Sequence, residues 1–128
     1  MDNFYIAATA TSPEVNFRFD QNLLSLSGES YPENAAAFYT PVIEKLRAYL
    51  ASCADTVVTA NVTLTYFNSS STKILFSIFD ALDRAASSGN RVLVNWYRDE
   101  EEETILEFCE ELQIDFTAIK FTDCPIAT

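Results

Sequence analysis

The chain has 128 residues, enough for one domain with one hydrophobic core and too few for two. Hydrophobic residues make up 48% and only two residues are glycine, which excludes a disordered or fibrous protein. Eight basic against 19 acidic residues give a net charge of −11, so neither nucleic acid nor an anionic membrane is an expected partner. Histidine is absent, which removes the commonest general base and metal ligand.

The cysteines and the apolar runs indicate the cellular compartment of the protein. Cys53, Cys109 and Cys124 are odd in number and widely spaced, which fits neither a disulfide framework nor a zinc site. No basic leader opens the chain, and no apolar run approaches the roughly 18 residues of a membrane span. We therefore expect a soluble, cytoplasmic protein with reduced, mostly buried thiols and with no metal or cofactor.

The first half of the chain predicts a hairpin and then a helix. Apolar residues alternate over 15–19 and again at 24–26, on either side of turn residues, which predicts an N-terminal β-hairpin. After a polar loop, Asn34 is a good cap for a helix from 35 to about 51. Pro41 lacks a backbone N–H, so we expect the helix to bend there or to restart after a Thr40 cap.

The second half predicts strands and helices in alternation. A Val- and Thr-rich stripe ending at Tyr66 is typical of a central strand, and the hydroxyl residues after Asn68 suit the start of a helix. Gly89 would end that helix in a left-handed conformation. The pattern then predicts a strand over 91–97, a third helix whose first turn is the acidic run 99–103, and a last strand over 116–121. The order predicts an α/β fold in a single domain, 1–128, with a mixed sheet of four to five strands and three helices on one face or both.

Most patterns that could carry chemistry are weak. Gly28 and Gly89 stand alone, so a glycine-rich phosphate loop is unsupported. Glu29 and Glu33 could share a loop as a catalytic pair, but solvated charges are the simpler interpretation. The run 99–103 lacks the ligand spacing and the glycine of a calcium loop.

The serine cluster has a sharper alternative. Hydroxyl residues at a helix start are usually caps, but residues 69–71 supply more hydroxyls than capping requires. They lie where a strand ends and a helix begins, and free N–H groups at that edge favour a phosphoryl group. A kinase could therefore use Ser69, Ser70 or Ser71, and phosphorylation would add about −1.5 to −2 charge.

Three blocks, residues 28–34, 66–73 and 78–82, give the chain a resemblance to a known family. It resembles, from about Phe4 to Phe121, the SiaC-type regulatory phosphoproteins of bacterial biofilm signalling, which are similar in fold to anti-anti-sigma factors and other STAS domains. The resemblance implies a STAS-like, non-enzymatic switch protein without catalytic residues.

The resemblance also implies a modification site and partners. A hydroxyl residue directly after the turn asparagine, here Ser69, would be phosphorylated by a Ser/Thr protein kinase and dephosphorylated by a PP2C-type phosphatase. The family's usual acceptor is threonine, so Ser70 and Ser71 stay open as acceptors. The unphosphorylated form would bind a diguanylate cyclase and stimulate cyclic di-GMP synthesis. The expected partner-binding residues are Asn68, Ser69, Ser70, Glu29, Ser30, Tyr31, Pro32, Glu33 and Asn34.

Two other functions stay open at this point. The same fold would suit an anti-anti-sigma factor in a partner-switching transcription pathway. A small enzyme using Glu29 or Glu33 would need a deep pocket beside them. The block at 28–34 also has a structural interpretation, since Tyr31 and Pro32 could simply fix the start of the first helix.

Overall fold

The structure is a computed structural model that describes residues 2–127 of the chain. Within this range the strands are β1 (Phe4–Ile6), β2 (Glu14–Arg18), β3 (Leu23–Ser30), β4 (Val57–Phe67), β5 (Arg91–Asp99) and β6 (Lys120–Ile126). The helices are α1 (Ala35–Ser52), α2 (Ser69–Ser87) and α3 (Glu103–Asp115), with a 3-10 turn at Phe19–Gln21.

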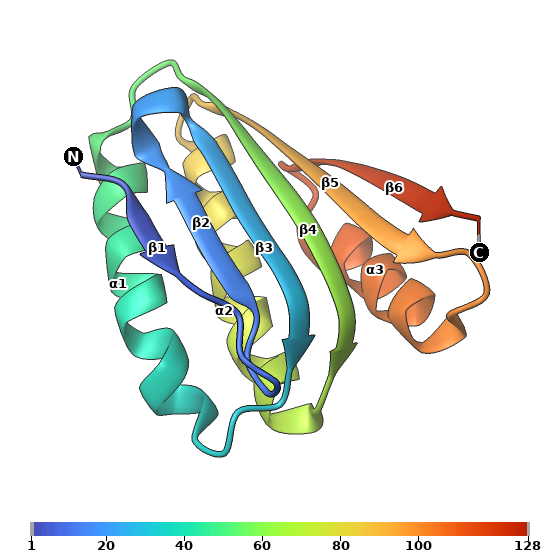
Figure 1. The fold of residues 1–128 in the computed structure, drawn as a ribbon. Coiled ribbons are helices and arrows are strands. Elements are labelled where there is room, and N and C mark those ends of the chain that lie inside the picture. Colours follow the sequence, from blue (N-terminus) through green and yellow to red (C-terminus); the bar gives the residue numbers. More distant parts are fainter. Residues whose placement is uncertain (1, 128) are drawn as a thin grey trace.

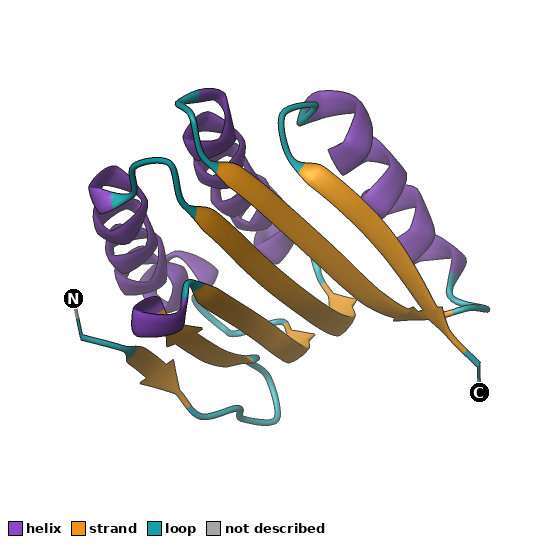
Figure 2. Cartoon of the chain, turned by 90° about the horizontal axis from the view of Figure 1, so that it is seen from above, coloured by secondary structure: helices purple, strands orange, loops and turns teal. Residues whose placement is uncertain are grey.

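The strands form one mixed sheet in the order in which they occur along the chain. Over residues 2–127 it has six strands, with β1, β2 and β3 antiparallel and β3 to β6 parallel (Figure 1). All three helices cover one face (Figure 2). The α/β class, the mixed sheet and the three helices are confirmed, but the expected four to five strands are too few. β1 has only three residues, which is too short to show an alternating pattern.

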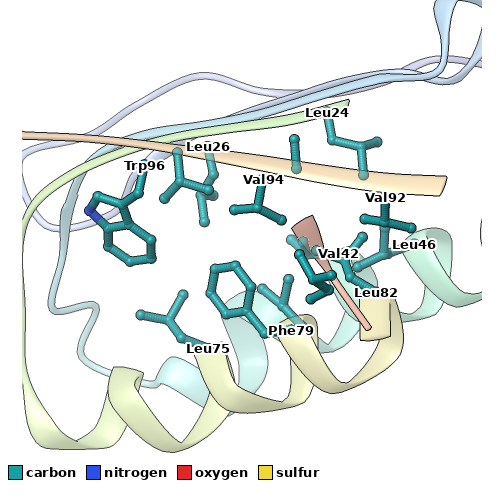
Figure 3. Close-up of a cluster of buried hydrophobic side chains, with 14 of the residues drawn as sticks. Leu24, Leu26, Val42, Leu46, Leu75, Phe79, Leu82, Val92, Val94 and Trp96 are labelled. Carbon is teal, nitrogen blue, oxygen red and sulfur yellow. The ribbon is translucent and has the colours of Figure 1, made fainter. Parts of the chain in front are cut away.

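The core lies between the sheet and the helices. Every second residue of β4 from Val58 to Leu64 is buried, as expected for a strand with one covered face. In the centre of the core, β5 packs over α2 through Val92, Val94 and Trp96 on the strand and Leu75, Phe79 and Leu82 on the helix (Figure 3). The same cluster includes two residues of β3, Leu24 and Leu26, and two of α1, Val42 and Leu46. On the opposite face of the sheet, Asn95 Nδ2 donates to Asn61 Oδ1 across 3.0 Å.

α1 is one helix that includes Pro41. Of the two alternatives expected at Pro41, a bend or a restart, the restart does not occur. The Thr40 hydroxyl donates to the Ala36 carbonyl oxygen within the same helix (2.7 Å) instead of capping a new one. The cap at Asn34 is confirmed, since its side chain accepts the Ala37 N–H.

The acidic run is mostly a turn and not the first turn of a helix. β5 continues to Asp99, and the Asp99 side chain and carbonyl accept the N–H groups of Glu101 and Glu102 (2.9 and 3.1 Å). α3 begins only at Glu103, because these local hydrogen bonds compete with helix formation.

The last strand begins later than the predicted 116–121. Asp83 of α2 accepts the backbone N–H groups of Ala118 and Ile119 (2.9 and 3.3 Å), which holds them in a loop before β6 begins at Lys120. β6 also tolerates Pro125, as an edge strand can.

Three further observations concern the described residues. No helix among them is long and apolar enough to cross a membrane. No group of three or more Cys, Asp or Glu in the described range is placed to hold a metal ion. Cys109 is buried, Cys53 and Cys124 are half-buried, and all three are free thiols.

Candidate functional site

The carboxyl ends of β3 and β4 and the first turns of α1 and α2 lie together at one edge of the molecule (Figure 1). Each helix starts with an asparagine cap at this edge. Asn34 Oδ1 accepts the Ala37 N–H (3.0 Å), and Asn68 Oδ1 accepts the Ser71 N–H (2.9 Å). Two parallel crossovers from neighbouring strands therefore bring both predicted segments, 28–34 and 68–71, to the same place.

The three serines after Asn68 differ in accessibility. Ser69 and Ser70 are exposed, whereas Ser71 is fully buried at 0% exposure. Successive residues of a helix point about 100° apart, so the third hydroxyl turns inward while the first two face solvent. Two candidate acceptor oxygens are thus open to another protein, and the third is sealed.

The sealed hydroxyl belongs to a buried polar cluster. Ser30 Oγ donates to Ser71 Oγ across 2.9 Å and lies 2.5 Å from the Tyr39 hydroxyl. Burial raises the pKa of Tyr39 to about 12, so the ring hydroxyl keeps its proton at neutral pH. Ser30 was expected on the partner surface, but it is 0% exposed because it is an inward-facing residue of β3.

An irregularity at the end of β4 changes which side chains reach the surface. Gly28 pairs with Leu64 but Glu29 pairs with Tyr66, which leaves Thr65 as an extra residue. Gly28 has φ of +120°, a conformation that a side chain disfavours. The predicted inward stripe therefore ends at Leu64 and not at Tyr66.

Tyr66 becomes a surface residue at the carboxyl end of β4, two residues before Asn68. It is 50% exposed, and its ring meets that of Tyr31, which is 36% exposed, edge to face at 5.5 Å between centroids. Exposed tyrosines are frequent anchors in protein interfaces because they bury a large area with few rotatable bonds. Sequence reasoning placed Tyr31 at the site but assigned Tyr66 to the core, and only the extra residue in β4 distinguishes the two outcomes.

A hollow of about 980 Å³ joins residues from both predicted segments. It is lined by Glu33, Asn34, Ala35, Ala36, Ser69, Ser70, Lys73 and Ile74. Lys73 was not anticipated as a site residue, although its spacing of four from Ser69 places both on one face of α2. Pro32 is half-buried, and Glu29 is exposed at the end of β3.

The arrangement does not resemble a carboxylate active site. Glu29 and Glu33 are both exposed, and only Glu33 of the two lines the hollow. A general acid or base needs a defined place next to a bound substrate, usually in a water-excluding pocket. What the edge offers is a surface with hydroxyl groups, two tyrosine rings, the carboxylates of Glu29 and Glu33, and the positive charge of Lys73.

The fold and the site together define a class: a small α/β domain whose mixed sheet has helices on one face and whose exposed hydroxyl groups lie at a capped helix start. The comparisons with known proteins give the family. The model of the SiaC family regulatory phosphoproteins matches residues 6–126, so the chain belongs to the SiaC family.

Its relatives include proteins from Pseudomonas aeruginosa. An uncharacterised protein of that organism is 30% identical over 115 residues, 90% of each chain. The crystal structure of apo-SiaC from P. aeruginosa superposes with a TM-score of 0.88 at 28% identity, covering 97% of this chain and 99% of that one. The same organism's SiaC in complex with the diguanylate cyclase SiaD, described as the activator of SiaD, gives a TM-score of 0.87 at 29% identity over 98% and 99% of the chains.

Proposed function

We propose that this protein is a non-enzymatic switch that binds and activates a diguanylate cyclase and that phosphorylation of Ser69 controls the binding. The observation that carries the proposal is the exposed Ser69 and Ser70 pair at the capped start of α2. The exposed Tyr31–Tyr66 ring pair lies at the same edge of the sheet, where β3 and β4 end. SiaC of P. aeruginosa forms a complex with the diguanylate cyclase SiaD, and this supports a cyclase, and not an anti-sigma factor, as the partner of the present protein. Because free thiols such as those of Cys53, Cys109 and Cys124 are typical of a reducing compartment, the proposed place of action is the cytoplasm.

Phosphate at this position would change the surface and leave the fold intact. A negative group in the first turn of a helix interacts favourably with the helix dipole, so α2 would be kept. The same dianion would have to be desolvated when a partner covers the edge, and it would repel acidic groups there. The phosphorylated protein would therefore release the cyclase. In this proposal a Ser/Thr kinase and a PP2C-type phosphatase set the balance.

The proposal favours Ser69, keeps Ser70 as the alternative acceptor and leaves Ser71 out. The hydroxyl of Ser71 is enclosed and hydrogen-bonded to Ser30, so a kinase would have to open the first turn of α2 to reach it. Mass spectrometry of the protein purified from its host, with fragmentation of the peptide that covers 69–71, identifies the acceptor.

The binding test compares Ser69→Ala, Ser69→Asp and wild type for cyclase affinity and for stimulated cyclic di-GMP synthesis. We expect Ser69→Ala to bind the cyclase like unphosphorylated wild type. Ser69→Asp should bind at least about tenfold more weakly, which corresponds to a loss of roughly 1.4 kcal/mol of binding free energy. Ser87→Asp is the matched control, because it adds the same charge to an exposed serine at the far end of α2. Equal affinity of all four proteins would contradict Ser69 as the switch.

A further inference from the structure

Ser30 contacts both ends of the turn that carries the exposed serines. Its carbonyl oxygen accepts the Asn68 N–H (3.1 Å), and its hydroxyl donates to Ser71 Oγ (2.9 Å). Asn68 and Ser71 are themselves joined by the cap hydrogen bond of 2.9 Å. Ser69 and Ser70 lie between these two residues, so Ser30 is hydrogen-bonded to the chain on both sides of the exposed serines.

The direction of the hydroxyl chain follows from the number of protons. Ser30 has a single hydroxyl proton, and it points toward Ser71. The Tyr39 hydroxyl must therefore donate to Ser30 Oγ across their 2.5 Å contact. Tyr39, from the second turn of α1, thus orients the Ser30 hydroxyl, and a buried hydrogen-bonded chain of this kind specifies one arrangement of its members.

We propose that Ser30 and Tyr39 are positioning residues of the switch. They hold the turn at 68–71 in one conformation and tie it to residues 31–34, which directly follow Ser30 in the chain. The inference rests on the proposed function in one respect, that the exposed serines of this turn are the phosphorylation site. A change in the conformation of this turn would then alter the conformation of residues 31–34, because both segments are attached to Ser30.

α1 supplies a matched control for Tyr39. Tyr49 is also buried, at 3% exposure, and its hydroxyl donates to Asn22 Oδ1 across 2.6 Å. Ten residues separate the two tyrosines, a rise of about 15 Å along a helix. Tyr49→Phe and Tyr39→Phe therefore delete the same kind of hydrogen bond from the same helix, far from the turn in one case and beside it in the other.

Amide hydrogen exchange measured by NMR tests the positioning without any partner. We expect Tyr39→Phe to raise the exchange rates of the Asn68 and Ser71 amides about fivefold, the size of one net hydrogen bond, through local opening of the turn. Ser30→Ala should raise them at least as much, and Tyr49→Phe should leave them at the wild-type rate. Wild-type exchange in Tyr39→Phe, or an equal rise in Tyr49→Phe, would overturn the inference.

Cyclase titration then tests whether the positioning matters for binding. Tyr39→Phe should weaken binding about fivefold while Tyr49→Phe keeps wild-type affinity, a difference that a general loss of stability would not produce. Equal affinity of the two variants would overturn the positioning role. If Ser69→Asp instead binds as tightly as wild type, the proposed switch fails, and the exchange rates still decide the roles of Ser30 and Tyr39.

Discussion

The side chain of Asn68 supports the exposed serines by a single well-placed hydrogen bond. Its Oδ1 accepts the Ser71 N–H while its own N–H is bound to the Ser30 carbonyl. A cap of this kind satisfies a donor that the helix cannot satisfy internally. The residue immediately before the candidate acceptor is therefore structural in its own right, and its loss would act on the turn from within.

We expect Asn68→Ala to lower the free energy of unfolding by about 1 kcal/mol, the usual cost of losing an N-cap. Asn68→Asp should keep most of that stability, because a carboxylate accepts the same hydrogen bond and interacts favourably with the helix dipole. Urea unfolding measures both. Asn34→Ala is the parallel case at α1. An Asn68→Asp variant as unstable as Asn68→Ala would show that the cap does not stabilise α2.

At the scale of elements, one ion pair joins β5, β6 and the turn before α3. Arg98 Nε and Nη2 donate to the two carboxylate oxygens of Asp123, each across 2.8 Å. Its Nη1 donates to the carbonyls of Asp99 and Glu100 (3.3 and 3.4 Å). The Arg98 side chain is 7% exposed, so its loss would leave Asp123 without a partner in a partly buried place.

We expect Arg98→Met to destabilise the protein by about 2 kcal/mol, in the range for hydrogen bonds to charged groups. Arg84→Met is the control, because Arg84 and Asp80 form an ion pair on the exposed surface of α2, with side chains 80% and 44% exposed. Its cost should stay below about 0.5 kcal/mol. Chemical denaturation measures the loss of free energy of unfolding in both variants. An equal loss in the two would mean that burial does not strengthen the ion pair of Arg98 with Asp123.

Periodic patterns predicted the long elements well, and local hydrogen bonds set the limits of that prediction. The hairpin, α1, α2, β4 and β5 follow from hydrophobic spacing and caps in the sequence. The late start of β6 depends on Asp83, which is 35 residues before Ala118. The exposure of Tyr66 depends on how β4 aligns with β3, and a single sequence does not contain that alignment.

The candidate site was predictable to a similar extent. The strand-to-helix turn identified Asn68 and the serines, and the resemblance singled out Ser69. Which serine faces inward depends on the rotation of α2 against the sheet, and the sequence does not contain that rotation. We expected Ser71 and Ser30 to be at the surface, but the structure places both in the interior. The role of Tyr39 could not be predicted from the sequence. Its position indicates an apolar site on a helix, and the sequence pattern of a buried tyrosine is the same whether or not its hydroxyl has a hydrogen-bond partner.

For the molecule as a whole, we expect buried ionisable groups to lower the stability at alkaline pH. Burial raises the pKa of the Cys109 thiol from its ordinary value of 9.0 to about 12, with the charge of Asp123 acting in the same direction. The folded protein then holds this proton more tightly than the unfolded chain. Its contribution is therefore complete below about pH 9 and is lost as the pH rises from there toward 12.

We predict that the free energy of unfolding falls between pH 9 and pH 11 and that Cys109→Ala reduces this fall by about 2 kcal/mol. The variant also loses some packing, but that cost is the same at every pH and leaves the slope unaffected. Tyr39 should add its own loss above pH 10, since burial raises its pKa from 10.0 to about 12. Parallel curves for wild type and Cys109→Ala would contradict this origin of the loss of stability at alkaline pH.

The hydrogen bond between Ser30 and Ser71 spans 41 residues of chain and so exists only after β3 and β4 have paired. A short peptide copied from around Ser69 would contain the acceptor hydroxyl without the support beneath it. Under the proposed function, a kinase that acts on this turn reads a shape assembled from distant segments, not a linear motif. Freshly made or damaged chains would then escape modification until they have reached the native state.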